Sequence, residues 1–212
     1  MTRAPSRPWA KLRNEGSRFF VVWIMTRRLL LALPLAVAAP LRSAQSDYVS
    51  AKRKLEQIES DRLKPGSRVA FTPQEISAYA QYEGQKAYPG GVRNTSIQLG
   101  SGVATGSALI DFGKIRRAQG QAPGWMMSRL LDGERPVNVT ASLRSSGGYA
   151  TVDVQSVDIS GFTIEGDVLD FLIRNYLLPN YPDAKIGEPF QLRHHVERIE
   201  VRPSVVNVFI GQ

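Results

Sequence analysis

Residues 96–112, SIQLGSGVATGSALIDF, mark the point where the apolar residues of this chain change from a helical spacing to alternation. Ile97 and Leu99 alternate with polar neighbours, and residues 100–102, GSG, then turn the chain. The residues after the turn again divide between two faces, which is the pattern of a half-buried β-strand. The stretch therefore predicts an antiparallel β-hairpin.

The same alternation continues toward the C-terminus. Residues 137–159 alternate on both sides of a turn at residues 145–148, SSGG, and residues 197–210 have the pattern of a last hairpin. The alternation slips near Gln155 and Ser156, which predicts a β-bulge at that place. Most of the second half of the chain is thus expected to form hairpins.

Two helices are expected before the first hairpin. Residues 46–63 repeat apolar side chains at steps of three and four with charged residues between them, and Lys64, Pro65 and Gly66 end that pattern. The next helix begins with a capping box. Thr72 is suited to the N-cap, and Glu75 three residues later returns a hydrogen bond to it.

Two further segments, residues 124–131 and 167–178, are predicted to be apolar helices inserted between the hairpins. The second is apolar on most of its circumference, so it must be nearly enclosed or must contact something apolar. Helices followed by hairpins indicate antiparallel pairing rather than βαβ units. We therefore expect an α+β fold, with a single domain over residues 45–212.

The N-terminal part has the pattern of a secretory signal peptide over residues 25–44. A basic start is followed by an apolar run at residues 29–39, which contains the small-residue pattern A-V-A at 36–38. We expect residues 1–24 to be an upstream extension that is not translated. We also expect the domain at residues 45–212 to be exported to the periplasm or cell envelope.

The charge of the chain is unevenly distributed. The formal net charge is +8, with 27 basic and 19 acidic residues, but residues 1–44 hold eight of the basic residues and one of the acidic ones. The remainder has 19 basic and 18 acidic residues, which excludes the electrostatic footprint of a nucleic-acid-binding protein. The chain has no cysteine, so disulfides, thiolate metal sites and cysteine nucleophiles are excluded as well.

Candidates for catalysis are few. His194 and His195 are the only histidines, and as neighbours in an expected strand they point to opposite faces and cannot share one metal ion. Gly100, Gly102 and Gly106 suit turns better than a phosphate-binding loop, and there is no G-x-S-x-G motif. We expect a protein that is not an enzyme and has no metal or cofactor.

The two apolar segments are the candidate binding surface. One interpretation makes both of them ordinary core helices. The other lets them line a groove for an acyl chain, since about 0.8 kcal/mol per buried CH₂ gives on the order of 10 kcal/mol for about a dozen methylenes before entropy costs. The candidate ligand-binding residues are Trp125, Met126, Met127, Leu130, Phe171, Leu172, Ile173 and Tyr176.

Four motifs lie between about Val69 and Gln212. They are a helix opening at Val69, Phe71, Thr72, Glu75 and Ile76, residues 92–94 before a hairpin, residues 108–112 at the end of one, and the helix at 168–178. This order of elements resembles small bacterial proteins of the AsmA-like and tubular lipid-binding (TULIP-like) superfamily. The resemblance implies a curved antiparallel sheet of hairpins wrapped on a long helix, and lipid binding or transport in the cell envelope.

The sequence thus predicts an exported domain that binds a lipid or another apolar ligand, with contact to the membrane periphery. A second interpretation is an envelope scaffold that docks a partner protein through its apolar helix. A third, a hydrolase of envelope polymers, would use dispersed carboxylates such as Asp153, Asp158 and Glu165, and no acidic pair of suitable spacing supports it.

Overall fold

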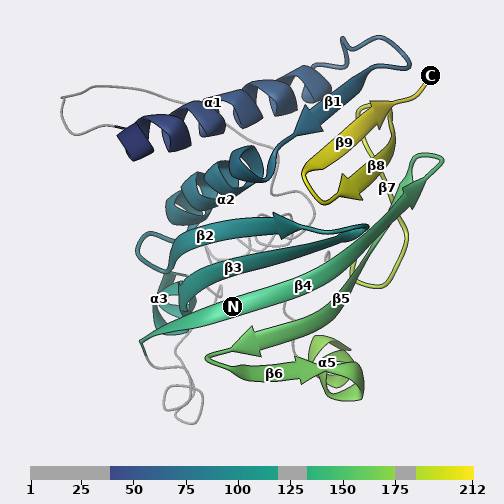
Figure 1. Ribbon diagram of the computed structural model, residues 1–212. Coiled ribbons are helices and arrows are strands. Elements are labelled where there is room, and N and C mark those ends of the chain that lie inside the picture. Colours follow the sequence, from purple (N-terminus) through teal and green to yellow (C-terminus); the bar gives the residue numbers. More distant parts are fainter. Residues whose placement is uncertain (1–38, 119–132, 175–184) are drawn as a thin grey trace, which may run out of the picture.

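The computed structural model describes residues 39–118, 133–174 and 185–212, in which the strands of two antiparallel sheets are the main regular structure (Figure 1). The first described elements are α1 (Ala39–Glu59), β1 (Arg68–Phe71) and α2 (Pro73–Ala87). Helix α1 begins inside the expected signal peptide and ends before the predicted stop at residues 64–66.

The start of α2 confirms the predicted capping box. The backbone nitrogen of Glu75 donates to Thr72 Oγ1 at 3.2 Å, and the backbone nitrogen of Thr72 donates to Glu75 Oε2 at 2.9 Å. Pro73 occupies the first turn, where its missing N–H costs nothing. The two hydrogen bonds satisfy two backbone donors that a helix end otherwise leaves without partners.

The larger sheet has the strand order β2-β3-β4-β5-β6. The expected hairpins are present in it, and β7 pairs with the start of β5. Its strands and the two short helices between them are β2 (Val92–Leu99), β3 (Val103–Asp111), α3 (Phe112–Ala118), β4 (Glu134–Ser146), β5 (Tyr149–Ile159), β6 (Phe162–Glu165), α5 (Gly166–Leu172) and β7 (Phe190–Gln191).

The predicted β-bulge in β5 is confirmed by the register of the β4–β5 pair. Thr140 pairs with Ser156, whereas Ala141 pairs with Val154, so Gln155 is the extra residue of β5. A bulge bends the strand and increases its twist. Figure 1 shows β4 and β5 running on beyond β3 to the second sheet.

The smaller sheet has the strand order β1-β9-β8, with β8 (Val196–Arg202) and β9 (Val205–Ile210) forming the expected last hairpin. One face of this sheet packs against α1, and the main core lies between them. The core residues are Tyr48, Ala51, Leu55, Ile58, Val69, Phe71, Tyr79, Val196, Val208 and Ile210.

The two sheets meet where β8 lies against the protruding end of the β4–β5 hairpin. The Ser145 hydroxyl donates to the Ile199 carbonyl at 2.7 Å and accepts from the Ile199 nitrogen at 2.6 Å. On either side, the nitrogen of Gly148 donates to the Glu197 carbonyl and that of Gly102 to the Val201 carbonyl. Four outward backbone groups of β8 therefore have partners, which covers this edge from Glu197 to Val201.

The expected α+β fold, a curved sheet wrapped on a long helix, is wrong. The fold is dominated by antiparallel sheet, and α1 and α2 lie at one end, beside the smaller sheet and β2 (Figure 1). No described helix runs inside the curve of the larger sheet. The wrapped arrangement was implied by the resemblance to TULIP-like proteins, and the loose apolar and turn motifs behind that resemblance do not determine which sheet covers which helix.

Of the two predicted apolar helices, the structure describes only part of the second. The predicted helix at 124–131 lies outside the described residues. Of the predicted helix at 167–178, the structure describes the part up to Arg174, in which α5 is only seven residues long. None of the helices described has the length and apolar character needed to cross a bilayer.

Candidate functional site

The predicted apolar binding residues are not brought together by the described structure. Trp125, Met126, Met127, Leu130 and Tyr176 lie outside the described residues, as does the side chain of Leu172. Ile173 is buried, whereas Phe171 is 55% exposed. Two members of the predicted set can thus be placed, one facing the interior and one facing outward.

Helix α5 is apolar on two opposite sides. Leu169 and Ile173, four residues apart, are buried on its inner face. Val168 and Phe171, three residues apart, are 63% and 55% exposed on the outer face. An amphipathic surface helix keeps polar residues on that outer face, so α5 departs from this pattern by exposing part of two apolar side chains.

The strand before α5 adds to this surface. Phe162, at the start of β6, is 77% exposed. Three carboxylate side chains that are also exposed, Glu165, Asp167 and Asp170, lie between and beside the apolar residues. We call the six residues Phe162, Glu165, Asp167, Val168, Asp170 and Phe171 the β6–α5 surface.

This surface lies at one edge of the larger sheet, where β6 is the last strand. The opposite edge, β2, is covered by α2. There the nitrogen of Ile97 donates to Ser77 Oγ at 2.8 Å, and that of Thr95 donates to the side-chain oxygen of Gln81. Among the described residues, no other element makes a backbone hydrogen bond to the outer side of β6.

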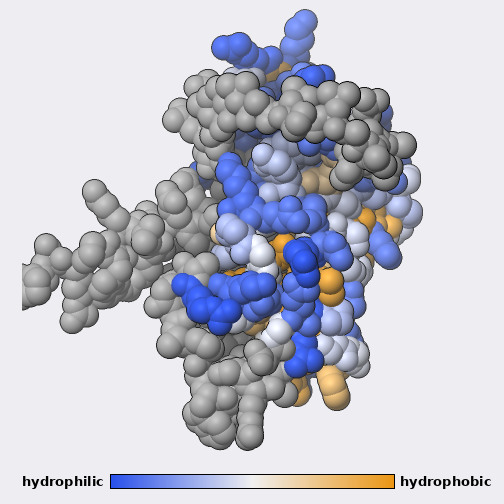
Figure 2. All heavy atoms as spheres, turned by 90° about the vertical axis from the view of Figure 1, so that its left-hand side faces the viewer, coloured by the Kyte–Doolittle hydropathy of each residue, from blue (hydrophilic) through white to orange (hydrophobic). Residues whose placement is uncertain are grey.

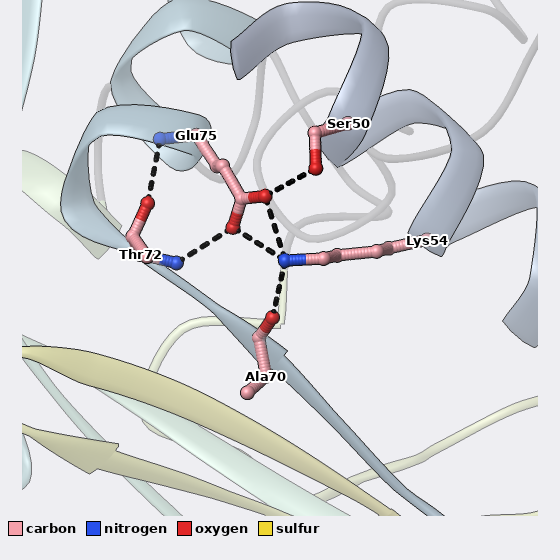
Figure 3. A network of polar contacts seen from close by, with 5 residues as sticks. All are labelled: Ser50, Lys54, Ala70, Thr72 and Glu75. Atoms are coloured by element: carbon pink, nitrogen blue, oxygen red, sulfur yellow. Dashed lines mark hydrogen bonds and ion pairs between the residues drawn. The ribbon is translucent and has the colours of Figure 1, made fainter.

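At the β1 edge of the smaller sheet, an ion-pair network satisfies the outward carbonyl of Ala70 (Figure 3). Lys54 Nζ donates to the Ala70 carbonyl at 2.7 Å and to both carboxylate oxygens of Glu75, at 2.6 and 2.7 Å. Ser50 Oγ donates to Glu75 Oε1 at 2.5 Å, and Thr72 supplies the backbone donor of the capping box.

Glu75 is only 6% exposed, and its environment keeps it charged. Burial raises the pKa of this carboxyl, but the hydrogen bonds from Lys54, Ser50 and the Thr72 nitrogen outweigh burial and hold the pKa below its usual value. Its acceptor positions are occupied by these donors. The network therefore joins α1, β1 and α2. A general base needs an acceptor position that a substrate can reach, and Glu75 has none left, so its geometry does not suit that role.

The described residues form a polar groove. It has a volume of about 1000 Å³ and is open to solvent. Its walls are the β4–β5 turn at residues 147–149, the segment 191–197 between β7 and β8, Asp61, and residues 211–212. The sequence analysis missed it, because these segments are far apart in the chain and only the two glycines at 147–148 indicated a turn.

The two histidines lie in this groove rather than in a strand, which corrects the sequence prediction. His194 and His195 have backbone φ angles of 58° and 55° and precede β8. Left-handed backbone is uncommon for residues other than glycine. His194 Nδ1 lies 3.1 Å from Asp61 Oδ1, and this contact joins the segment after α1 to the segment before β8.

Within the described ranges, no group of three or more His, Asp or Glu side chains is placed to hold a metal ion.

Figure 2 shows the side of the molecule on the left in Figure 1, where the coloured side chains are mainly hydrophilic and the hydrophobic ones form small separate groups.

Comparisons with family models, with curated proteins and with solved structures find no match to this chain, so the similarity to the AsmA-like and TULIP-like superfamily stays a prediction.

Proposed function

We propose that this protein is a non-catalytic binding module of the cell envelope that docks a partner protein through the β6–α5 surface. The observation that carries the proposal is the outward exposure of Val168 and Phe171 on a helix whose inner face is already buried by Leu169 and Ile173. The envelope location follows from the signal-peptide pattern at residues 25–44.

Burial of the exposed apolar side chains provides the affinity. Fully burying a side chain of this size is worth about 1.5–3 kcal/mol. Because Phe162, Val168 and Phe171 are 77%, 63% and 55% exposed, together they offer on the order of 4 kcal/mol before the costs of association. Aromatic side chains are enriched among the residues that dominate protein interfaces. The outer side of β6 can supply backbone hydrogen bonds to an added strand as well.

The carboxylates of the surface favour a protein partner over a lipid. Glu165, Asp167 and Asp170 place negative charge around the apolar side chains. Anionic lipid headgroups would be repelled by that charge, whereas lysine or arginine side chains around an apolar contact would complement it. Binding of a lipid, which the sequence analysis predicted, is therefore the competing outcome of the experiment below.

The proposal is tested with a library of random peptides selected on the full chain. Peptides are selected for binding to the wild type, and those that also bind the double variant Val168→Ser/Phe171→Ser are removed. The remaining peptides should combine apolar and basic residues. Val49→Ser is the matched control, because Val49 is 41% exposed on α1 and lies outside the surface. Val49→Ser should retain the selected peptides.

Two results would contradict the proposal. One is the absence of any peptide that distinguishes the wild type from the double variant. The other is binding of phosphatidylglycerol vesicles that is lost in the double variant and retained in Val49→Ser, which would support the lipid alternative.

A further inference from the structure

We propose that the polar groove between the β4–β5 turn and the segment before β8 is a binding site for a neutral saccharide. This inference does not depend on the docking of a partner at the β6–α5 surface. It rests on the shape of the groove, on the kind of polar groups that line it, and on one exposed aromatic ring.

The polar side chains of the groove share one chemical property. Each ends in a planar group with donors or acceptors in a fixed arrangement, and none of the lining residues is a lysine, serine or threonine. Pairs of neighbouring sugar hydroxyls match the amide, guanidinium and carboxylate groups, because each of these can engage two hydroxyls at once, and the imidazole of His195 can engage one. The groups available are those of Gln191, Arg193, His195 and Glu197.

Tyr149 supplies an apolar face to the same groove. It is the first residue of β5, lines the groove and is 53% exposed. Its ring is a flat surface with a polar hydroxyl at one end. The C–H face of a pyranose ring is apolar, so it can stack on the Tyr149 ring while its hydroxyls contact the planar groups.

The backbone around the groove is already held in place. The nitrogen of Leu192 donates to the Gly148 carbonyl at 2.7 Å, and the nitrogen of Gly211 donates to the His195 carbonyl at 2.7 Å. The Asp61–His194 contact at 3.1 Å fixes a third segment. A preformed site loses less conformational entropy on binding than a flexible one.

Size and charge argue against other ligands. A volume of about 1000 Å³ lies at the upper end of small-molecule pockets, which suits an oligosaccharide better than a single ion. Arg193 lines the groove together with Glu197, while Asp61 contacts His194, so basic and acidic groups are mixed and neither anions nor cations are favoured. The polar lining does not suit an acyl chain.

The test is an NMR titration of the ¹⁵N-labelled full chain with chitotetraose, cellotetraose and maltotetraose. Each is added up to about 10 mM, so that dissociation constants in the millimolar range can be detected. We expect at least one of them to shift the amide signals of residues 147–149 and 191–197. Tyr149→Ala should weaken that binding at least about tenfold, whereas Tyr149→Phe, which keeps the ring, should stay within about threefold.

Phe162→Ser is the matched control, because it removes an exposed aromatic ring outside the groove and should leave saccharide binding unchanged. The NMR spectrum of each variant shows directly whether it is folded. The proposal is wrong if none of the three saccharides shifts the groove signals, or if a folded Tyr149→Ala variant binds as tightly as the wild type. Neither result bears on the β6–α5 surface.

Discussion

Lys54 Nζ lies 2.6 Å from one carboxylate oxygen of Glu75 and 2.7 Å from the other, and its third donor reaches the carbonyl of Ala70. That carbonyl belongs to the outer side of β1, so the ion pair also covers part of a sheet edge. Exposed edges are templates for unwanted pairing, and proteins cover them in specific ways. Here the side chain of Lys54, on α1, covers the outward carbonyl of Ala70.

Removing the lysine should destabilise the protein more than removing the charge of its partner. In Lys54→Met the Glu75 carboxylate stays buried without its cation, so we expect a loss of about 2–4 kcal/mol in the free energy of unfolding. In Glu75→Gln the Lys54 ammonium still reaches solvent, and the expected loss is about 1–3 kcal/mol. Urea denaturation measures both.

Arg53→Met is the control for these variants, because Arg53 is exposed on the same helix and its loss should change stability by less than about 0.5 kcal/mol. If Lys54→Met is as stable as Arg53→Met, the ion pair does not hold α1 to β1 and α2.

The same pair predicts a pH dependence. In the wild type the Glu75 pKa lies below its unfolded value, so its contribution to stability is present above that value, about 4.3, and is lost as pH falls through the folded pKa. In Lys54→Met, burial without the cation raises the folded pKa, and stability instead falls as pH rises. The stability difference between the two proteins should therefore shrink from pH 7 to pH 4. A difference that stays constant over that interval would contradict the assigned role.

The junction of the two sheets depends on one hydroxyl. Ser145→Ala leaves both the N–H and the C=O of Ile199 without their present partner, and we expect it to cost about 1–3 kcal/mol. Ser145→Thr keeps the hydroxyl and should retain most of the stability. Ser101→Ala, in an exposed turn, should have little effect. Thermal unfolding that gives equal losses for the alanine variants at 145 and 101 would rule out this junction.

The β2 edge offers a test by hydrogen exchange. Ser77→Ala and Gln81→Ala each remove the acceptor of one outward amide, that of Ile97 and that of Thr95 respectively. Exchange at the corresponding amide should rise by about tenfold or more, because local opening then breaks one hydrogen bond fewer. The amides of Ser96 and Gln98 point toward β3 by strand alternation and serve as internal controls. Equal acceleration at all four amides would indicate general destabilisation instead.

Local sequence signals predicted the elements well. The capping box of Thr72 and Glu75 needs residues three apart, and the bulge at Gln155 follows from a slip in alternation within one strand. The buried stripe of α1, with Ala51 and Ile58 among its members, follows from helical spacing alone. These features depend on neighbours within a few residues, which is the range over which a sequence pattern can be interpreted.

Features that join distant segments were not predictable in the same way. Lys54 is one of the charged residues between the apolar positions of the helix predicted at 46–63, yet its ammonium binds Glu75, 21 residues away. His194 and His195 continue an apparent strand pattern, but both adopt left-handed backbone in a turn before β8. The candidate apolar site was only partly located, because five of its eight residues lie outside the described chain and Ile173 is used by the core.

The most direct test of the central proposal is photo-cross-linking in the native host with benzoylphenylalanine at position 168, compared with position 49. We predict a discrete protein adduct at position 168 that is lost when Phe171→Ser is added, with no such adduct at position 49. Adducts with lipid alone, or adduct formation at position 168 that does not exceed that at position 49, would contradict the account.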